Sequence, residues 1–141
     1  VGGLLPVATL TGNGFMSFGD KQKMFKSMPS SGGGLTHIAS VNRYDRLGVI
    51  IYNIPNNESA QGMFLLKAGN GLYPTPTLTK LVGNNMAGKI LYKMTDTTMD
   101  LFYKAPNVDI GPKDIFQTII GTPIYTTYNG STENMTELAV S

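Results

Sequence analysis

Cysteine and tryptophan are both missing from this chain of 141 residues, which contains a single histidine. Without cysteine the protein has no disulfide framework and no thiolate chemistry, so a role outside a cell requires another source of stability. Oligomerisation is the source that we expect. One histidine and nine acidic residues scattered along the chain also exclude a zinc site of ordinary composition. The sequence therefore predicts no metal site and no cofactor.

Charge is scarce as well, because charged residues make up 14 % of the chain, whereas about a quarter is usual. The net charge is +2 and the basic residues form no run, so we expect no binding to nucleic acid. No apolar run approaches the roughly 18 residues of a membrane span, so we expect no membrane insertion. Glycine and neutral polar residues replace the missing charge. This composition suits extracellular or virion proteins and chains that associate with copies of themselves.

The first 34 residues differ in pattern from the rest, which predicts a junction segment over 1–34 and a single β domain over 35–141. The chain lacks an initiator methionine and a signal peptide, so we expect it to be a piece of a longer protein. Ser17 and Asp20 have the spacing of a capping box, and Pro29 is a helix stop. We therefore expect a short helix over 17–28, followed by a glycine-rich hinge.

Residues 35–141 show the period of two that is typical of β-strands, with turn signals between the segments. The predicted fold class is all-β, an antiparallel β-sandwich or jelly-roll-like head preceded by the short helix. Residues 114–120 allow either a strand or a helical turn. The expected strands cover 35–41, 47–53, 62–68, 89–94, 98–104, 114–120, 124–128 and 137–140.

The clearest hairpin joins residues 89–94 to residues 98–104 through a short polar turn. Alternation along its second strand places Met99, Leu101 and Tyr103 on one side of the sheet. Asp100, Phe102 and Lys104 then lie on the other side.

A catalytic site has little support in this sequence, and we expect no enzyme activity. His37 is the only candidate base, with Ser40 and Asp45 as its possible partners, but no nucleophile-elbow motif occurs. Its place in an alternating strand, on the same face as Leu35 and Ala39, favours a structural or interface role. The pair Asp109 and Asp114 is at most a remote candidate for a shared loop cation.

Tyrosine and asparagine residues in predicted turns suggest a carbohydrate-binding surface, because rings stack on sugars and amides bind hydroxyls. The alternative is that each tyrosine fills a half-buried strand position. Sequons at Asn57, Asn129 and Asn134 mark surface loops without proving glycosylation. The candidate receptor-binding residues are Asn56, Asn57, Asn70, Tyr73, Tyr125, Tyr128 and Asn129.

One segment, Gly14-Phe15-Met16-Ser17-x-x-Asp20-Lys21-x-Lys23-Met24, resembles a G-L-M-S-x-x-D-K-x-K-L-type stretch of bacteriophage fibre proteins. In that family the stretch precedes a distal β domain. The segment Leu35-Thr36-His37-Ile38-Ala39-Ser40 looks like the entry strand of such a domain. The pair Ile90-Leu91-Tyr92-Lys93-Met94 and Met99-Asp100-Leu101-Phe102-Tyr103-Lys104-Ala105 looks like its hairpin, with Met99 in a place often held by tryptophan.

The resemblance implies a homotrimeric head domain of a tail or head fibre, exposed on the virion surface. Its implied partners are other virion structural proteins and a bacterial surface glycan or protein that serves as receptor. The alternatives are a structural fibre module without a receptor site and, remotely, a fibre-associated depolymerase. The trimer contacts that we expect involve Phe18, Met24, Phe25 and Met28.

Overall fold

The computed structural model describes residues 25–42, 44–54, 62–69, 75–83, 85–95, 97–109 and 113–141. These residues form β-strands, and no helix occurs among them, so none that could cross a membrane is found there. The strands are β1 (Phe25–Ser27), β2 (Leu35–Asn42), β3 (Leu47–Ile54), β4 (Gly62–Ala68), β5 (Thr77–Gly83), β6 (Lys89–Met94), β7 (Thr98–Lys104), β8 (Lys113–Ile120), β9 (Thr126–Tyr128) and β10 (Thr136–Glu137).

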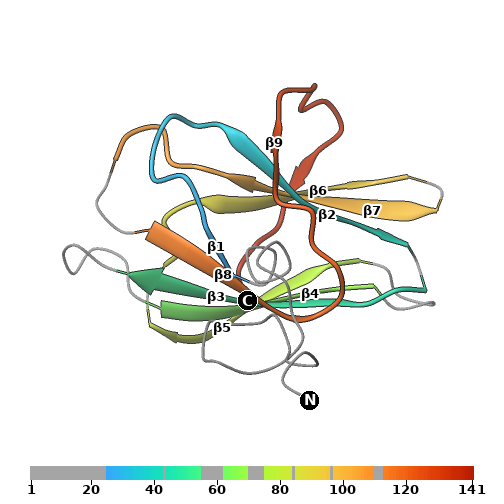
Figure 1. Cartoon of the computed structure of the whole chain (residues 1–141), viewed down its shortest axis with the longest axis horizontal. Coiled ribbons are helices and arrows are strands. Elements are labelled where there is room, and N and C mark those ends of the chain that lie inside the picture. Colours follow the sequence, from blue (N-terminus) through green and yellow to red (C-terminus); the bar gives the residue numbers. More distant parts are fainter. Residues whose placement is uncertain are drawn as a thin grey trace, which may run out of the picture.

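Two five-stranded antiparallel sheets form the molecule and lie face to face (Figure 1). The order in the first sheet, here called sheet A, is β1-β8-β3-β4-β5. The order in the second sheet, here called sheet B, is β10-β6-β7-β2-β9. The prediction of an all-β protein with two antiparallel sheets is therefore confirmed.

The core lies between the sheets and follows the period of two along each strand. Val49 and Ile51 of β3 and Phe116 of β8 point inward from sheet A and are fully buried. Leu101 and Tyr103 of β7 point inward from sheet B. The alternation of apolar and polar residues in the sequence thus fixes which side of each strand faces the other sheet.

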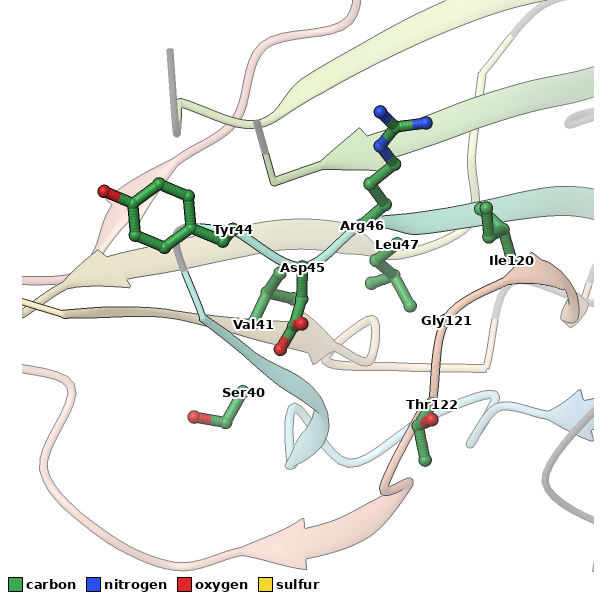
Figure 2. Close-up of a pocket in the computed structure, with 9 residues that line it drawn as sticks. All are labelled: Ser40, Val41, Tyr44, Asp45, Arg46, Leu47, Ile120, Gly121 and Thr122. Carbon is green, nitrogen blue, oxygen red and sulfur yellow. The ribbon is translucent and has the colours of Figure 1, made fainter. Parts of the chain in front are cut away.

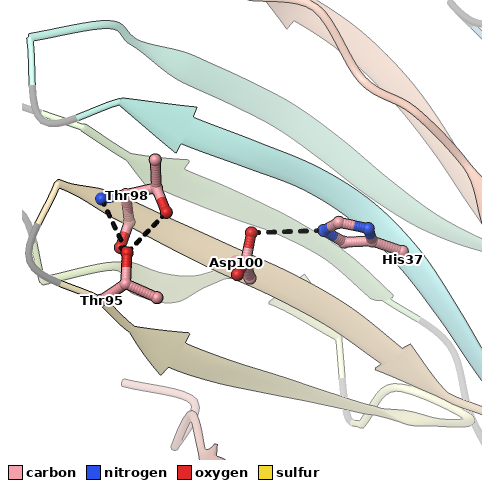
Figure 3. Close-up of polar contacts among 4 residues, drawn as sticks. All are labelled: His37, Thr95, Thr98 and Asp100. Carbon is pink, nitrogen blue, oxygen red and sulfur yellow. Dashed lines mark hydrogen bonds and ion pairs between the residues drawn. The ribbon is translucent and has the colours of Figure 1, made fainter. Parts of the chain in front are cut away.

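The predicted hairpin over 89–94 and 98–104 is confirmed, because β6 and β7 pair along their whole length. Its turn is fixed locally: the Thr98 backbone N–H donates to Thr95 Oγ1 at 3.0 Å, and the two hydroxyls lie 2.7 Å apart (Figure 3). Met99, Leu101 and Tyr103 face the core, as expected.

Strand β2 departs from the simple alternation that the sequence predicts. Its pairing with β7 shifts between His37 and Ala39, which is the mark of a β-bulge. Ile38 and Ala39 are consequently both buried in the core, while His37 lies on the outer face of sheet B. The expectation that His37 shares a face with Ala39 is wrong, because the extra residue of the bulge reverses the alternation.

The helix expected over 17–28 is wrong at its C-terminal end, where Phe25–Ser27 forms strand β1 and pairs with β8. Pairing with an available sheet edge overrides the weak helical preference of this short segment. Residues 17–24 lie outside the described residues. Residues 113–120 form strand β8, which decides the alternative between strand and helical turn at that place.

A buried polar cluster, here called the Asp114 cluster, joins the two sheets. Asp114 of β8 is fully buried, and its Oδ2 accepts hydrogen bonds from Tyr103 Oη at 2.6 Å and from the Gly88 N–H at 2.9 Å. Its Oδ1 accepts from Asn53 Nδ2 and from the Ala87 N–H, the latter at 3.2 Å. Because four donors from three segments converge on it, this carboxylate anchors sheet A to sheet B.

Burial and the neighbouring Asp114 carboxylate raise the pKa of Tyr103 well above its ordinary value, so its hydroxyl stays protonated as a donor. Gly88 is required beside it, because a Cβ there would lie 2.3 Å from Tyr103 Oη. A larger residue at position 88 would therefore displace the tyrosine from the carboxylate.

The last strands enclose sheet B on both sides, since β9 pairs with β2 at one edge and β10 pairs with β6 at the other. The connection between them, residues 129–135, stands on the side of sheet B that faces away from sheet A (Figure 1). After β10 the chain returns to sheet A, where Val140 bridges to Leu78 and Ser141 N–H donates to Leu78 O at 2.9 Å.

Candidate functional site

A polar hollow of about 420 Å³ lies at one end of the molecule, between the β2–β3 turn and the connection from β8 to β9 (Figure 2). We call it the turn pocket. Leu47 and Ile120 contribute its apolar lining. Its polar lining comes from Ser40, Tyr44, Asp45, Arg46 and Thr122.

The turn that builds this pocket is set by Asn42 at the end of β2. Its side-chain Oδ1 accepts from the Tyr44 N–H at 3.3 Å, and its carbonyl oxygen accepts from the Asp45 N–H at 2.9 Å. Asparagine favours such turns because its short amide side chain can replace a backbone acceptor. The turn therefore projects three consecutive large polar side chains, Tyr44, Asp45 and Arg46, from a fixed backbone.

Two glycines with positive φ hold the backbone of the turn in place. Gly69 follows β4 with φ +85°, and a Cβ there would lie 2.0 Å from the Asp45 carbonyl oxygen. Gly121 follows β8 with φ +98°, and its Cβ would lie 2.4 Å from the Arg46 carbonyl oxygen. Only glycine fits such close approaches in this backbone region. The turn pocket is thus preorganised by contacts from three separate segments.

The side chains of the turn lie at the surface. The Tyr44 side chain projects from the surface, and the residue is 75 % exposed. Within the described part of the chain, Asp45 and Arg46 make no ion pair with each other or with another residue. Figure 2 shows the Asp45 carboxylate pointing toward the side of Ser40 and Thr122, whereas Arg46 points the opposite way. The turn therefore presents an acceptor on the side of Ser40 and Thr122, donors on the opposite side, and an aromatic ring at the surface.

His37 lies elsewhere, on the outer face of sheet B. Its Nε2 is 3.5 Å from Asp100 Oδ1 (Figure 3), and its ring stacks on Phe102 at 4.8 Å between centroids. Phe102 also contacts Tyr128 at 4.7 Å, so the three rings form one cluster that covers Phe102. Ser40 and Asp45 line the turn pocket, and His37 does not. The described residues therefore do not assemble the hydrolytic set considered from the sequence.

No group of three or more metal-ligating side chains occurs among the described residues. Asp114, considered as a partner of Asp109 for a cation, instead accepts hydrogen bonds from four donors of the protein. The oxygens of this buried carboxylate are therefore used by donors of the protein itself.

The predicted receptor residues have different environments. Tyr125 is partly buried, its hydroxyl lies 3.2 Å from Thr118 Oγ1, and burial raises its pKa to about 12. Tyr128 belongs to the ring cluster with His37 and Phe102, and its hydroxyl donates to the Ser131 carbonyl at 3.0 Å. Both tyrosines thus support the fold, while Asn129 is exposed. Asn56, Asn57, Asn70 and Tyr73 lie outside the described residues.

The residues expected at a trimer interface are also divided. Phe18 and Met24 lie outside the described residues. Phe25 is 41 % exposed on the edge strand of sheet A, whereas Met28 is 2 % exposed and packs in the core. Of the described pair, only Phe25 therefore offers its side chain to another molecule.

Tyr44 and Arg46 are not among the binding residues predicted from the sequence. The signal that could have found them is the run from Asn42 to Arg46, a charged and aromatic turn between two apolar strands in a chain with little charge. Thr122 could not have been found in this way, because only the fold brings it to the turn.

Known proteins offer no guide to this site. Comparison of the chain with protein-family models, curated proteins and solved structures finds no match.

Proposed function

We propose that this chain is the distal head domain of a bacteriophage fibre and binds a bacterial surface glycan through the turn pocket. The observation that carries the proposal is the preorganised turn, which presents an exposed ring beside a carboxylate and a guanidinium that form no ion pair within the described residues. The motif over residues 14–24 and the all-β fold support the fibre assignment. The proposed location is the surface of the virion, next to other structural proteins of the particle.

A glycan fits the turn pocket better than an apolar ligand does. Sugars present an apolar face of C–H groups, which packs against an aromatic ring such as Tyr44. Their hydroxyl groups donate to a carboxylate and accept from a guanidinium, and hydrogen bonds to charged groups are the stronger ones. Asp45 supplies the acceptor on the side where Ser40 and Thr122 add neutral hydroxyls, and Arg46 supplies donors on the other side of the turn.

The outer face of sheet A supports self-association as part of the same proposal. The strand register places a run of apolar side chains on this face, where a second surface could cover them. Assembly as a trimer should give a mass close to three times 15.2 kDa by light scattering. A stable monomer at micromolar concentration would contradict this part of the proposal. The apolar residues on the outer face of sheet A are Phe25, Ile50, Tyr52, Met63, Leu65 and Ile115.

Binding is tested with the purified chain on a bacterial glycan array, followed by adsorption to cells that display the glycan found. Tyr44→Ala and Asp45→Asn should each lower the affinity at least about tenfold, equivalent to about 1.4 kcal/mol. Glu133→Gln is the matched control, because Glu133 is exposed and does not line the turn pocket.

Two results would count against glycan binding by the turn pocket. Equal loss in the control and in the pocket variants would show a general surface effect. Trimers that bind no glycan and no cell would favour the alternative, a structural fibre module without a receptor site.

A further inference from the structure

The outer face of sheet B carries one unfavourable charge arrangement. On this face, three pairs of opposed residues form rows across β6 and β7. Lys93 lies opposite Asp100, which pairs opposite charges, and Leu91 lies opposite Phe102, which pairs two apolar residues. The remaining row places Lys89 directly opposite Lys104. Like charges in opposite positions of an antiparallel pair destabilise the pairing.

Among the described residues, only one of these two lysines has an ion-pair partner. Lys89 Nζ lies 3.1 Å from Glu137 Oε1 of β10. No carboxylate in the described part of the chain forms an ion pair with Lys104. Within the described residues this row therefore has two positive charges and one negative charge, and Lys104 has no ion-pair partner at its exposed position.

The same row borders a hollow of about 410 Å³ on the outer face of sheet B. Leu35 and Leu91 supply its apolar residues, and Thr132 and Met135 of the β9–β10 connection also line it. Both lysines line this hollow together with Glu137. Figure 1 shows the connection standing on this face of the sheet.

Smaller hollows adjoin the same lysines. One of about 110 Å³, beside Pro106 and Asn107, is lined by both Lys89 and Lys104. Another of about 220 Å³, beside Asn85 and Leu138, is lined by Lys89 and Glu137. The hollows of about 410 and 110 Å³ share both lysines and therefore adjoin one charged row, and we call these two hollows the lysine groove. Its extent suits a chain-like ligand rather than a single small ion.

We propose that the lysine groove binds an acidic glycan, with an oxyanion of the ligand placed between Lys89 and Lys104. The oxyanion supplies the charge that the row lacks, and lysine binds such groups as a point charge. Leu35 and Leu91 pack against the apolar face of a sugar ring, and Thr132 offers a hydroxyl. This inference rests on the proposed role as a head domain that binds bacterial glycans, and it adds a second site for a glycan that carries carboxylate or phosphate.

The test uses calorimetric titration of the full chain with three defined probes. An oligogalacturonate supplies carboxylates, a glycerol phosphate oligomer supplies phosphates, and a neutral galactose oligomer serves as the uncharged control. We expect one or both acidic probes to bind, with an affinity that falls as salt rises from 50 to about 200 mM because the contact is ionic. The two acidic arms decide which oxyanion the groove prefers.

Lys104→Gln should lower the affinity for the acidic probe at least about tenfold and remove most of its salt dependence. Lys67→Gln is the matched control, since Lys67 is an exposed lysine on the outer face of sheet A, and it should change neither. Equal affinity of Lys104→Gln and the unmodified chain would overturn the inference. Stronger binding of the neutral oligomer than of either acidic one would also overturn it.

Cell adsorption of the variants tests the turn pocket separately from the lysine groove. If no acidic probe binds and cell adsorption depends on Asp45 but not on Lys104, binding in the lysine groove is overturned. Binding in the turn pocket is then still supported. Binding of an acidic probe that depends on Lys104, without any effect of Tyr44→Ala or Asp45→Asn on adsorption, supports the groove and removes the turn pocket.

Discussion

Two aspartates of this protein, Asp114 between the sheets and Asp45 in the turn pocket, use their carboxylates in opposite ways. Asp114 accepts hydrogen bonds from four donors of its own chain and is fully buried. Asp45 lies exposed in a turn whose backbone is fixed by neighbouring glycines, and it pairs with nothing in the described residues. A carboxylate with all its acceptors used serves the fold, whereas one held in place with its acceptors unused is available to a ligand.

The largest effect should come from removing the buried carboxylate. Asp114→Ala leaves Tyr103, Asn53 and two backbone N–H groups without their acceptor, and we expect a loss of about 3–5 kcal/mol in the free energy of unfolding. Asp45→Ala should stay within about 0.5 kcal/mol of the unmodified chain, since its exposed carboxylate forms no ion pair within the described residues. Urea denaturation of both variants measures the loss in the free energy of unfolding. Similar losses would contradict the different roles of the two carboxylates.

The free energy of unfolding should also fall at alkaline pH because of two buried tyrosines. Burial raises the pKa of Tyr125 to about 12 and also raises that of Tyr103, so both hydroxyls hold their protons longer in the folded chain. Below the ordinary tyrosine pKa of about 10, neither state loses a proton and stability is constant. Between about pH 10 and 12 the unfolded chain ionises first, so Tyr125 alone should cost roughly 2–3 kcal/mol by pH 12.

The alkaline effect is measured by urea denaturation at several pH values from 8 to 11.5. Tyr125→Phe should flatten the fall in stability above pH 10, because phenylalanine cannot titrate. A fall of the same steepness in this variant would show that Tyr125 does not cause it.

Adding a Cβ at Gly121 tests how firmly the turn pocket is built. Gly121→Ala combines a positive φ with a contact of 2.4 Å to the Arg46 carbonyl oxygen, and we expect a loss of about 1–3 kcal/mol. Gly32→Ala is the control for φ alone, because Gly32 has φ +93° but open space around its Cβ; it should cost about 1 kcal/mol. Thermal unfolding compares the two, and equal losses would mean that the close approach at the turn contributes nothing.

The smallest expected effect concerns the lysine row. Lys104→Gln removes one of two opposed positive charges, so it should stabilise the unliganded chain by about 0.2–0.5 kcal/mol at low salt. Thermal unfolding at 10 and 200 mM salt should show this gain shrinking as screening increases. A loss of stability instead would show that Lys104 already has a compensating contact.

Local patterns in the sequence predict much of the fold. The β6–β7 hairpin, β3 and β4 all follow from alternating apolar residues between turn signals. Strand β5 was missed because it follows a proline-rich segment and its second half, Leu81–Gly83, is exposed, so no alternation marks it. Strand β1 looked helical because its identity depends on the edge of β8, which local sequence does not reveal.

The site was harder to predict than the fold because its parts are distant in the sequence. Gly69 and Gly121 meet the backbone of Asp45 and Arg46 only after three segments have assembled. The bulge after His37 moved that residue to the outer face, where Asp100 and Phe102 became its neighbours. A single extra residue in one strand thus changes which side chains can act together.

The return of the C-terminal residues to β5 has a consequence for how copies of the chain can join. Open edges of β-sheets recruit strands from other molecules and lead to unlimited growth. Here Ser141 hydrogen-bonds on both sides of Thr79, at Leu78 and Lys80, and so occupies part of the β5 edge. Among the strands that the structure describes, the other three edges are the short strands β1, β9 and β10. Association is therefore directed to the faces of the sheets, where contacts can close into a finite assembly instead of adding strands without end.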